Sequence, residues 1–285
     1  MVIKSCLNDL PKYSPWPARL LGLTDYQQRH KTPQEITREY EHEKWGALLD
    51  KVHRFGKAVT LDEIDKWALD TTQEILCSIQ DDYYRMNPLE AHERYLNLVE
   101  DYLSDFLPAT SLVELGAGYG SIILGLGKKS GIREMNILAA EYTNSGIDLI
   151  KHVARAERLK ITVDRCDFSA VPITNLPISS GAIIFTSYAT PYVPIMPDSF
   201  VHSLAGFDPS VVIHFEPCYE HCDQNTLIGM LRRRYIEIND YNRNLVTLLQ
   251  EHETKGTLKI LKEERSLFGN NPLLPISVIA WKPNK

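Results

Sequence analysis

The sequence predicts an α/β protein in which a helical region precedes a mostly parallel β-sheet with crossover helices. From Leu112 onward, short apolar segments alternate with longer amphipathic segments, which is the pattern of strands connected by helices. Before that point, apolar residues recur at three- and four-residue intervals behind helix-capping residues, which is typical of helices. We therefore expect an N-terminal arm and helical cap over residues 1–108 and a sheet domain over residues 109–285.

The composition is that of a soluble globular protein. Of the 285 residues, 44% are hydrophobic and 24% are charged, which is ample for a large core. No apolar run approaches the roughly 20 residues needed to cross a bilayer, and the first residues lack the apolar core of a signal peptide. Five scattered cysteines fit reduced thiols better than a disulfide framework. We expect a cytoplasmic protein with no membrane partner.

The excess negative charge lies in the cap. The net charge is −6, and the first 110 residues carry 13 Lys and Arg against 19 Asp and Glu. A nucleic-acid-binding protein needs a basic stripe, whereas the one dense basic run here is Arg232–Arg234. We therefore expect no nucleic-acid partner. The acidic cap favours a cationic or amine-bearing partner, or it is simply a solvated face.

The N-terminal third begins with an arm and continues with helices. Three prolines between residues 11 and 17 favour an extended arm. Capping signals at Thr32, Thr60 and Asn87 each predict the start of a helix. The second of these helices is expected to carry apolar residues from Leu61 as far as Ile79.

The remaining elements follow the alternating pattern. Strands are predicted at 111–115, 136–141, 161–166, 181–187 and 210–216, and helices at 121–130, 144–158 and 195–206. A single long helix is predicted at 224–252. Two closing strands, 257–264 and 274–283, are separated by a turn-forming cluster at 269–272.

A glycine-rich turn joins the first predicted strand to its helix. The stretch VELGAGYGS, residues 113–121, places glycines at 116, 118 and 120. Glycines let the backbone approach a ligand closely, and the helix that follows offers free N–H groups. Because ligands bind outside the carboxyl ends of strands in open α/β sheets, this turn predicts a nucleotide site. The dinucleotide fingerprint G-x-G-x-x-G would need a glycine in place of Ser121, so a nicotinamide-dependent reductase is the weaker alternative.

Residues Glu114 to Gly120 resemble the D/E-x-G-x-G-x-G motif of class I S-adenosylmethionine-dependent methyltransferases. The order of predicted elements from about residue 110 is similar to that family too. The resemblance implies a seven-stranded, mostly parallel Rossmann-like methyltransferase sheet, whose last strand inserts antiparallel, with the helical cap as a lid. It implies S-adenosyl-L-methionine as cofactor and methyl transfer to a nitrogen or oxygen of a small molecule or peptide, with natural-product biosynthesis as one setting. It indicates no subfamily, and a non-catalytic scaffold of this fold is an alternative.

The resemblance also implies which residues bind the cofactor. Glu141, at the end of the second strand, would accept both ribose hydroxyls, and Tyr142 would lie along the nucleoside. Asp167, after the third strand, would accept the adenine amino group, with Phe168 beside the ring. The full expected set is Glu114, Gly116, Ala117, Gly118, Gly120, Glu141, Tyr142, Asp167, Phe168 and Ser187.

The candidates for catalysis lie at the ends of the fourth and fifth strands. They are Tyr188, His214 and Glu216, because a carboxylate or imidazole there could orient or deprotonate the acceptor. The alternative is a core histidine and a loop carboxylate. Ser187 supplies no acidic ligand for magnesium, and the cluster of Cys218, His221 and Cys222 lacks the second segment of a structural zinc site. We therefore expect no metal.

Overall fold

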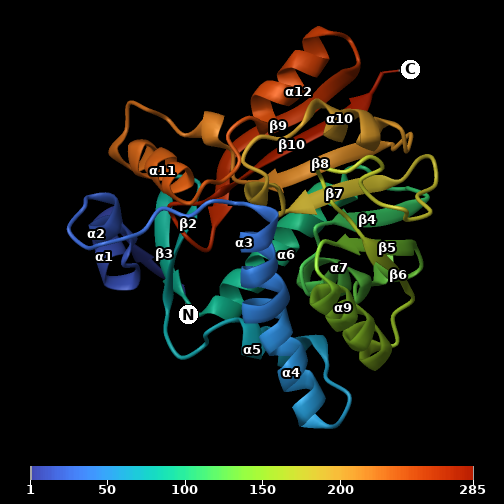
Figure 1. Cartoon of the computed structure of the whole chain (residues 1–285), viewed down its shortest axis with the longest axis horizontal. Coiled ribbons are helices and arrows are strands. Elements are labelled where there is room, and N and C mark those ends of the chain that lie inside the picture. Colours follow the sequence, from blue (N-terminus) through green and yellow to red (C-terminus); the bar gives the residue numbers. More distant parts are fainter. Residues whose placement is uncertain (1, 285) are drawn as a thin grey trace.

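The computed structural model describes residues 2–284 and shows one ten-stranded mixed sheet with helices on both faces (Figure 1). The strand order is β1-β3-β2-β9-β10-β8-β7-β4-β5-β6. The strands from β6 to β8 in this order run parallel, and the pairs from β8 to β1 are antiparallel. The expectation of seven mostly parallel strands is therefore wrong in strand number and in the balance of directions.

The five parallel strands lie where the sequence predicts them. They are β4 (Ser111–Leu115), β5 (Asn136–Glu141), β6 (Ile161–Arg165), β7 (Ile183–Ser187) and β8 (Val211–Glu216). Helices cover both faces of this part of the sheet, so most of its central strands are buried on both sides and read as continuous apolar runs.

The two closing strands complete the fold that the resemblance implies. The last strand, β10 (Ile276–Pro283), inserts antiparallel between β8 and β9 (Leu258–Gly269). Its register places Ser277 opposite Glu216. From β4 onward the strands thus follow the arrangement that the resemblance implies, and three N-terminal strands are added to it.

Those three strands come from the region that the sequence predicts to be helical. They are β1 (Ile3–Ser5), β2 (Ile75–Ile79) and β3 (Asp82–Met86). The predicted helix through Ile79 is wrong, because α5 (Leu61–Ala68) ends where the side chain of Asp70 accepts a hydrogen bond from the Thr72 N–H at 3.0 Å. Such a turn stops the helix, and β2 then pairs with the open edge of β9.

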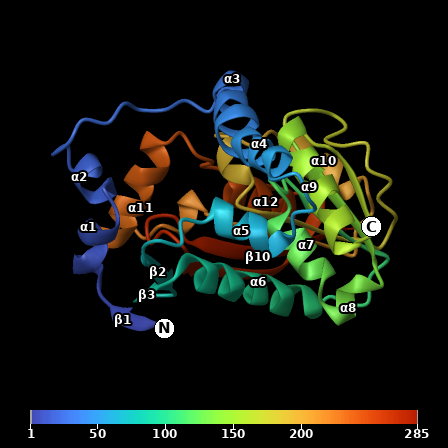
Figure 2. The same cartoon turned by 90° about the horizontal axis from the view of Figure 1, so that it is seen from below.

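The N-terminal arm is also more regular than expected. It forms α1 (Leu10–Tyr13) and α2 (Trp16–Leu20), each with a proline in its first turn, where the missing N–H costs nothing. Both helices lie beside α11 at one end of the molecule (Figures 1 and 2). The ring of Trp16 contacts that of Tyr235 edge to face at 4.5 Å.

The predicted long helix at 224–252 is two helices. The first is α11 (Leu227–Ile238) and the second is α12 (Leu245–Thr254). Asp240 between them has a left-handed φ of 51°. The side-chain oxygen of Asn242 accepts hydrogen bonds from the N–H groups of Asn244 and Leu245 at 3.2 and 3.0 Å. Asn and Asp side chains of this kind compete with helical hydrogen bonds, which explains the break.

The remaining helices form the lid and the two outer layers. The lid is one continuous helix made of α3 (Pro33–Ile36), a π-helical segment (Thr37–Lys44) and α4 (Trp45–Phe55). One face of the sheet carries α5, α6 (Pro88–Ser104), α7 (Ser121–Gly127) and α9 (Asn144–Glu157), with α8 (Ser130–Arg133) at its margin (Figure 2). The other face carries α10 (Asp198–Ala205) and α12. None of the helices described is long and apolar enough to span a membrane.

Candidate functional site

A cavity of about 590 Å³ lies at the carboxyl ends of β4, β5, β6 and β7. The lid contributes its roof through Tyr40 and Trp45. Nine of the ten residues expected to bind the cofactor line this cavity, namely Glu114, Gly116, Ala117, Gly118, Glu141, Tyr142, Asp167, Phe168 and Ser187. Gly120 does not appear in the described lining.

The glycines of the turn are required by left-handed backbone and close contacts. Gly116 has φ +77°, and a Cβ there would lie 2.4 Å from the Cβ of Ala189. Gly118 has φ +59°, and a Cβ there would lie 3.1 Å from the ring of Trp45. At Gly120, φ is +86° and a Cβ would meet Leu124 and a side chain of α9. Gly120 therefore serves the packing of the turn, which explains its place outside the cavity.

Glu114 supports the turn from below. It is buried at the end of β4, and its Oε2 accepts a hydrogen bond from the Ile123 N–H at 3.0 Å. This contact satisfies one of the free N–H groups at the start of α7. Burial raises the pKa of the Glu114 carboxyl well above its usual value.

Glu141 is held by hydrogen bonds from both sides of the site. Its Oε2 accepts from the Gly118 N–H at 2.9 Å, and its Oε1 accepts from the N–H and hydroxyl of Thr143 at 3.1 and 2.8 Å. Burial raises the pKa of this carboxyl. A carboxylate has about four acceptor sites. Three are occupied by these hydrogen bonds, so the oriented Glu141 keeps about one for a hydroxyl group in the cavity.

The ends of β5 and β6 supply flat and polar surfaces. Asp167 accepts a hydrogen bond from the Ser169 N–H at 2.8 Å through Oδ1. The buried ring of Phe168 packs edge to face on Phe200 at 5.1 Å. The guanidinium of Arg165 lies over the ring of Tyr142 at 5.2 Å. This wall suits an aromatic ligand that carries hydrogen-bond donors.

The lid residues were missed by the sequence analysis. The ring of Trp45 lies 5.1 Å from that of Tyr119, directly over the glycine turn. The carboxylate of Glu41 accepts the N–H groups of Asn144 and Ser145 at 2.7 and 3.1 Å, which ties the lid to the start of α9. Helical spacing marks an apolar face on the lid, but it does not reveal which side chains reach across to the turn.

A buried lysine also faces the cavity from the segment just before the lid. The ammonium of Lys31 lies 5.1 and 5.3 Å from the rings of Tyr192 and Tyr241 and 3.1 Å from a carboxylate oxygen of Glu39. Burial lowers its pKa, while Glu39 opposes that shift. Lys44 lines the cavity as well. Among the lining residues described, the cap supplies these two cations and no carboxylate.

The end of the cavity beside α6, its cap-side end, includes a group of neutral polar and aromatic side chains. Tyr95 and Ser187 share a hydrogen bond of 2.7 Å between their hydroxyl oxygens. The Tyr188 hydroxyl donates to a backbone carbonyl, that of Leu274, at 3.1 Å, and its φ is +50°. The buried side-chain oxygen of Asn270 has no hydrogen-bond partner. Such an orphaned acceptor is costly, so it marks a place for a donor group.

A histidine at the same end is backed by a carboxylate. Nε2 of His92 lies 3.8 Å from Oδ2 of Asp65, and Oδ1 of Asp65 accepts a hydrogen bond from the Tyr119 hydroxyl at 2.9 Å. Burial lowers the pKa of His92 and raises that of Asp65 to about 6. No local motif marks these residues, because they come from α5, α6 and the glycine turn.

His214 lies in the core rather than the cavity. The Trp281 indole N–H donates to its Nε2 at 3.0 Å, and its Nδ1 lies 3.0 Å from the hydroxyl oxygen of Thr186. Both ring nitrogens are therefore occupied, and Nδ1 carries the proton. Burial lowers the pKa of His214 to about 3. The geometry argues against the expected catalytic role, since a neutral ring held from both sides cannot reach an acceptor.

Glu216 lies beneath the loop that follows β7. Its Oε1 accepts a hydrogen bond from the Ala189 N–H at 3.0 Å, and burial raises its pKa to about 7. It does not appear in the described lining of the cavity. The structure therefore places it as a support for the loop that carries Tyr188, which does line the cavity, rather than as a group that meets the acceptor.

The cysteine and histidine cluster after β8 does not converge on one point. The ring nitrogens of His221 lie 2.8 Å from the Ser277 hydroxyl and 3.0 Å from a carboxylate oxygen of Glu263. The thiols of Cys218 and Cys222 donate to backbone carbonyls instead. These contacts explain the cluster without an ion.

Known proteins resemble this chain in structure but not detectably in sequence. No protein-family model and no curated protein matches the sequence. A structure provisionally assigned as a sarcosine dimethylglycine methyltransferase from Galdieria sulphuraria is 17% identical, with a TM-score of 0.43 over 62% of this chain and 64% of that one. An S-adenosylmethionine-dependent methyltransferase from Aquifex aeolicus is 14% identical, with a TM-score of 0.45 over 64% and 88%. One from Clostridium acetobutylicum ATCC 824 is 11% identical, with a TM-score of 0.48 over 68% and 92%. This chain thus spans just under two thirds of the Galdieria protein.

Proposed function

On the class I methyltransferase fold described above, we propose that this cavity binds S-adenosylmethionine and that the chain is a methyltransferase. One observation carries the proposal. Carboxylates at the ends of three adjacent parallel strands, Glu114, Glu141 and Asp167, line a single cavity together with the glycine turn. A nucleoside attached to an amino acid presents hydroxyl and amino donors along its length, and this arrangement offers an acceptor for each.

The residues fit the cofactor in a defined order. Glu141, already oriented by Gly118 and Thr143, would accept a ribose hydroxyl through its remaining acceptor site. Asp167 would accept the adenine amino group, with Phe168 along the ring. The start of α7 beyond the glycine turn offers N–H groups for the carboxylate of the methionine part. When bound, the cofactor would supply an electrophilic methyl group on a sulfonium.

The acceptor would occupy the cap-side end of the cavity. Asn270 offers an unpartnered acceptor oxygen there, while Tyr95 and Tyr188 provide aromatic walls. The cap contributes lysines but no carboxylate to the described lining, so none of its acidic side chains contacts the acceptor directly. We therefore favour a small, uncharged molecule or side chain with a hydroxyl or amine group over a cationic acceptor.

The chain's own residues would position this acceptor and receive its proton. Methyl transfer from a sulfonium is an in-line displacement, so alignment supplies much of the rate. The lid, held to α9 by Glu41, would keep water out of the reaction. His92, whose pKa burial lowers, would accept the proton at this end, with Asp65 behind it.

Ligand binding tests the proposal. Isothermal titration should show S-adenosylhomocysteine binding to the wild-type protein, and the Glu141→Gln variant should bind it at least ~10-fold more weakly because hydrogen bonds to a charged group contribute roughly 1.5–3 kcal/mol. Glu134→Gln, which changes an exposed glutamate of the same domain, is the matched control and should bind as the wild type does. Binding of NADH in place of S-adenosylhomocysteine would overturn the proposal in favour of a reductase.

A further inference from the structure

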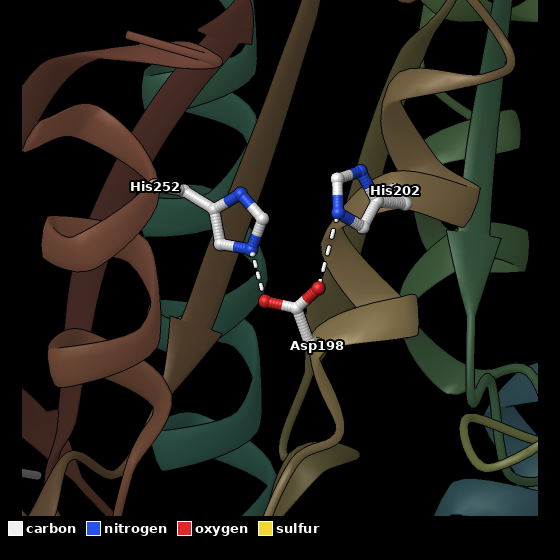
Figure 3. A group of neighbouring side chains, drawn as sticks. All are labelled: Asp198, His202 and His252. Atoms are coloured by element: carbon white, nitrogen blue, oxygen red, sulfur yellow. Dashed lines mark hydrogen bonds and ion pairs between the residues drawn. The ribbon is translucent and has the colours of Figure 1, made fainter. Parts of the chain in front are cut away.

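Three metal-ligating side chains meet on the face of the sheet opposite α6 and α7. Asp198 and His202 lie one turn apart on α10, and His252 comes from the last turn of α12 (Figure 3). Nε2 of His202 lies 3.0 Å from Oδ2 of Asp198, and Nε2 of His252 lies 2.9 Å from Oδ1. The ligand atoms of all three residues lie within 4.8 Å of one another.

The hydrogen bonds behind His252 decide which of its nitrogens carries a proton. The hydroxyl of Thr257 donates to the backbone carbonyl of His252 at 3.0 Å. Its oxygen must therefore accept from Nδ1 of the ring, 2.9 Å away. In the neutral ring, Nε2 is then left with a lone pair that faces an oxygen of Asp198. Two acceptors at that distance need a proton or a metal ion to hold them together.

We propose that Asp198, His202 and His252 bind a zinc ion, with water completing the coordination. Imidazole nitrogens together with one carboxylate suit Zn²⁺, whereas Mg²⁺ and Ca²⁺ prefer oxygen ligands alone. A histidine that binds zinc through one ring nitrogen usually donates a hydrogen bond from its other ring nitrogen to a fixed oxygen. His252 is arranged in this way, with Nδ1 donating to Thr257.

The spacing of the ligand atoms is close to what zinc requires. Zn–N distances of about 2.0–2.1 Å and Zn–O distances of about 2.0–2.2 Å place neighbouring ligands of a tetrahedron roughly 3.3 Å apart. The carboxylate oxygens are 2.9 and 3.0 Å from the two rings. The remaining adjustment is a closer approach of the two imidazoles, which a rotation of the exposed His202 side chain provides.

The surroundings give the ion access and a fixed base. The side chain of His252 is 1% exposed, whereas those of Asp198 and His202 are 58% and 61% exposed. Among the described residues, Lys255 is the one lysine or arginine that pairs with Asp198, with Nζ 4.0 Å from Oδ1. Because its side chain is 57% exposed, it can move into solvent when an ion binds. None of the three ligands lines the cavity. The ion would tie α10 to α12 and take no part in methyl transfer.

Zinc titration of the chelator-treated protein tests this site. Isothermal titration should show one equivalent bound by the wild type, and added zinc should raise its melting temperature. His202→Asn should weaken zinc binding by at least ~10-fold. Loss of a residue that only hydrogen-bonds to a metal ligand can already weaken binding about 10-fold, and His202 would be a ligand itself. His53→Asn, which changes an exposed histidine on α4, should bind zinc as the wild type does.

The variant His202→Asn removes an exposed side chain, so it should fold, and a far-ultraviolet circular dichroism spectrum checks this directly. Co²⁺ in place of zinc should give the visible absorption of a four-coordinate ion in the wild type and lose it in the variant. Equal zinc binding by wild type and His202→Asn, or no binding by either, would overturn the proposal. The cluster would then be a carboxylate held by hydrogen bonds from the two imidazoles. Neither result depends on S-adenosylhomocysteine binding.

Discussion

The contact between Gly116 and Ala189 gives the sharpest test of the site geometry. An alanine at 116 must adopt φ +77° and place its Cβ 2.4 Å from that of Ala189. Ala189 cannot simply retreat, because its N–H donates to the buried carboxylate of Glu216 at 3.0 Å. The substitution Gly116→Ala therefore forces two separable costs on the loop between β4 and α7.

The magnitudes follow from these two costs. A left-handed backbone at a non-glycine residue costs roughly 1–2 kcal/mol. Overpacking in a buried contact typically costs about 1–3 kcal/mol more, so Gly116→Ala should lower the free energy of unfolding by about 2–5 kcal/mol. Ala189→Gly removes the opposing methyl group and by itself should cost about 0.5–1 kcal/mol through chain entropy. The double variant should be more stable than Gly116→Ala alone.

Urea denaturation of the wild type, the two single variants and the double variant measures the coupling between positions 116 and 189. Tryptophan fluorescence and circular dichroism report the unfolding. The expected interaction free energy is about 1–3 kcal/mol in favour of the double variant, equal to the removed overlap. Gly131→Ala is the matched control, because a Cβ at Gly131 meets nothing within 4 Å and its φ is not left-handed, so its effect should stay within ~1 kcal/mol. If the effects of the two substitutions simply add within ~0.5 kcal/mol, the close approach of the two loops is refuted.

Three further predictions address single residues. Glu141→Gln should lower the unfolding free energy of the ligand-free protein by about 1–3 kcal/mol, because its amide must face the Gly118 N–H or the Thr143 donors; unchanged urea midpoints would contradict this. His214→Gln should cost about 1–3 kcal/mol of stability yet keep S-adenosylhomocysteine affinity within ~2-fold; unchanged stability with weakened binding would place His214 in the ligand site and not in the core. Asp65 has its folded pKa raised to about 6 from 3.8, so the folded state binds the proton more tightly and stability falls as pH rises through that window. Asp65→Asn should therefore be more stable than the wild type at pH 8 by about 1–3 kcal/mol, with the gap closing toward pH 4; an equal gap at both pH values would refute the linkage.

The sequence could predict the elements whose signals are local. Largely apolar segments placed the central strands β4, β5, β7 and β8 nearly to the residue, because strands covered on both faces must be mostly apolar. The edge strand β6 is only partly buried. Spacing marked the glycines of the turn, and the resemblance to methyltransferases pointed to Glu141. The structure brings Gly116, Gly118 and Glu141 to one cavity. Their function as a cofactor site remains a proposal.

The sequence could not predict what depends on partners distant in the chain. Ile75–Ile79 has the spacing of a helix, but the open edge of β9 makes it a strand. The helix predicted at 224–252 breaks because asparagine and aspartate side chains satisfy the backbone locally. Strand number was therefore underestimated, since pairing at a sheet edge leaves no periodic signal in either strand.

Within the site, the sequence by itself determined which residues lie at the strand ends, because the carboxyl ends of parallel strands must meet at one edge of the sheet. Only the tertiary structure decided which side chains face the cavity. It set His214 against Trp281 in the core, placed Glu216 beneath a loop, and brought His92 and Asn270 in from distant elements. The physical reason is that strand ends are fixed by local pattern, whereas the direction of a side chain depends on what packs around it.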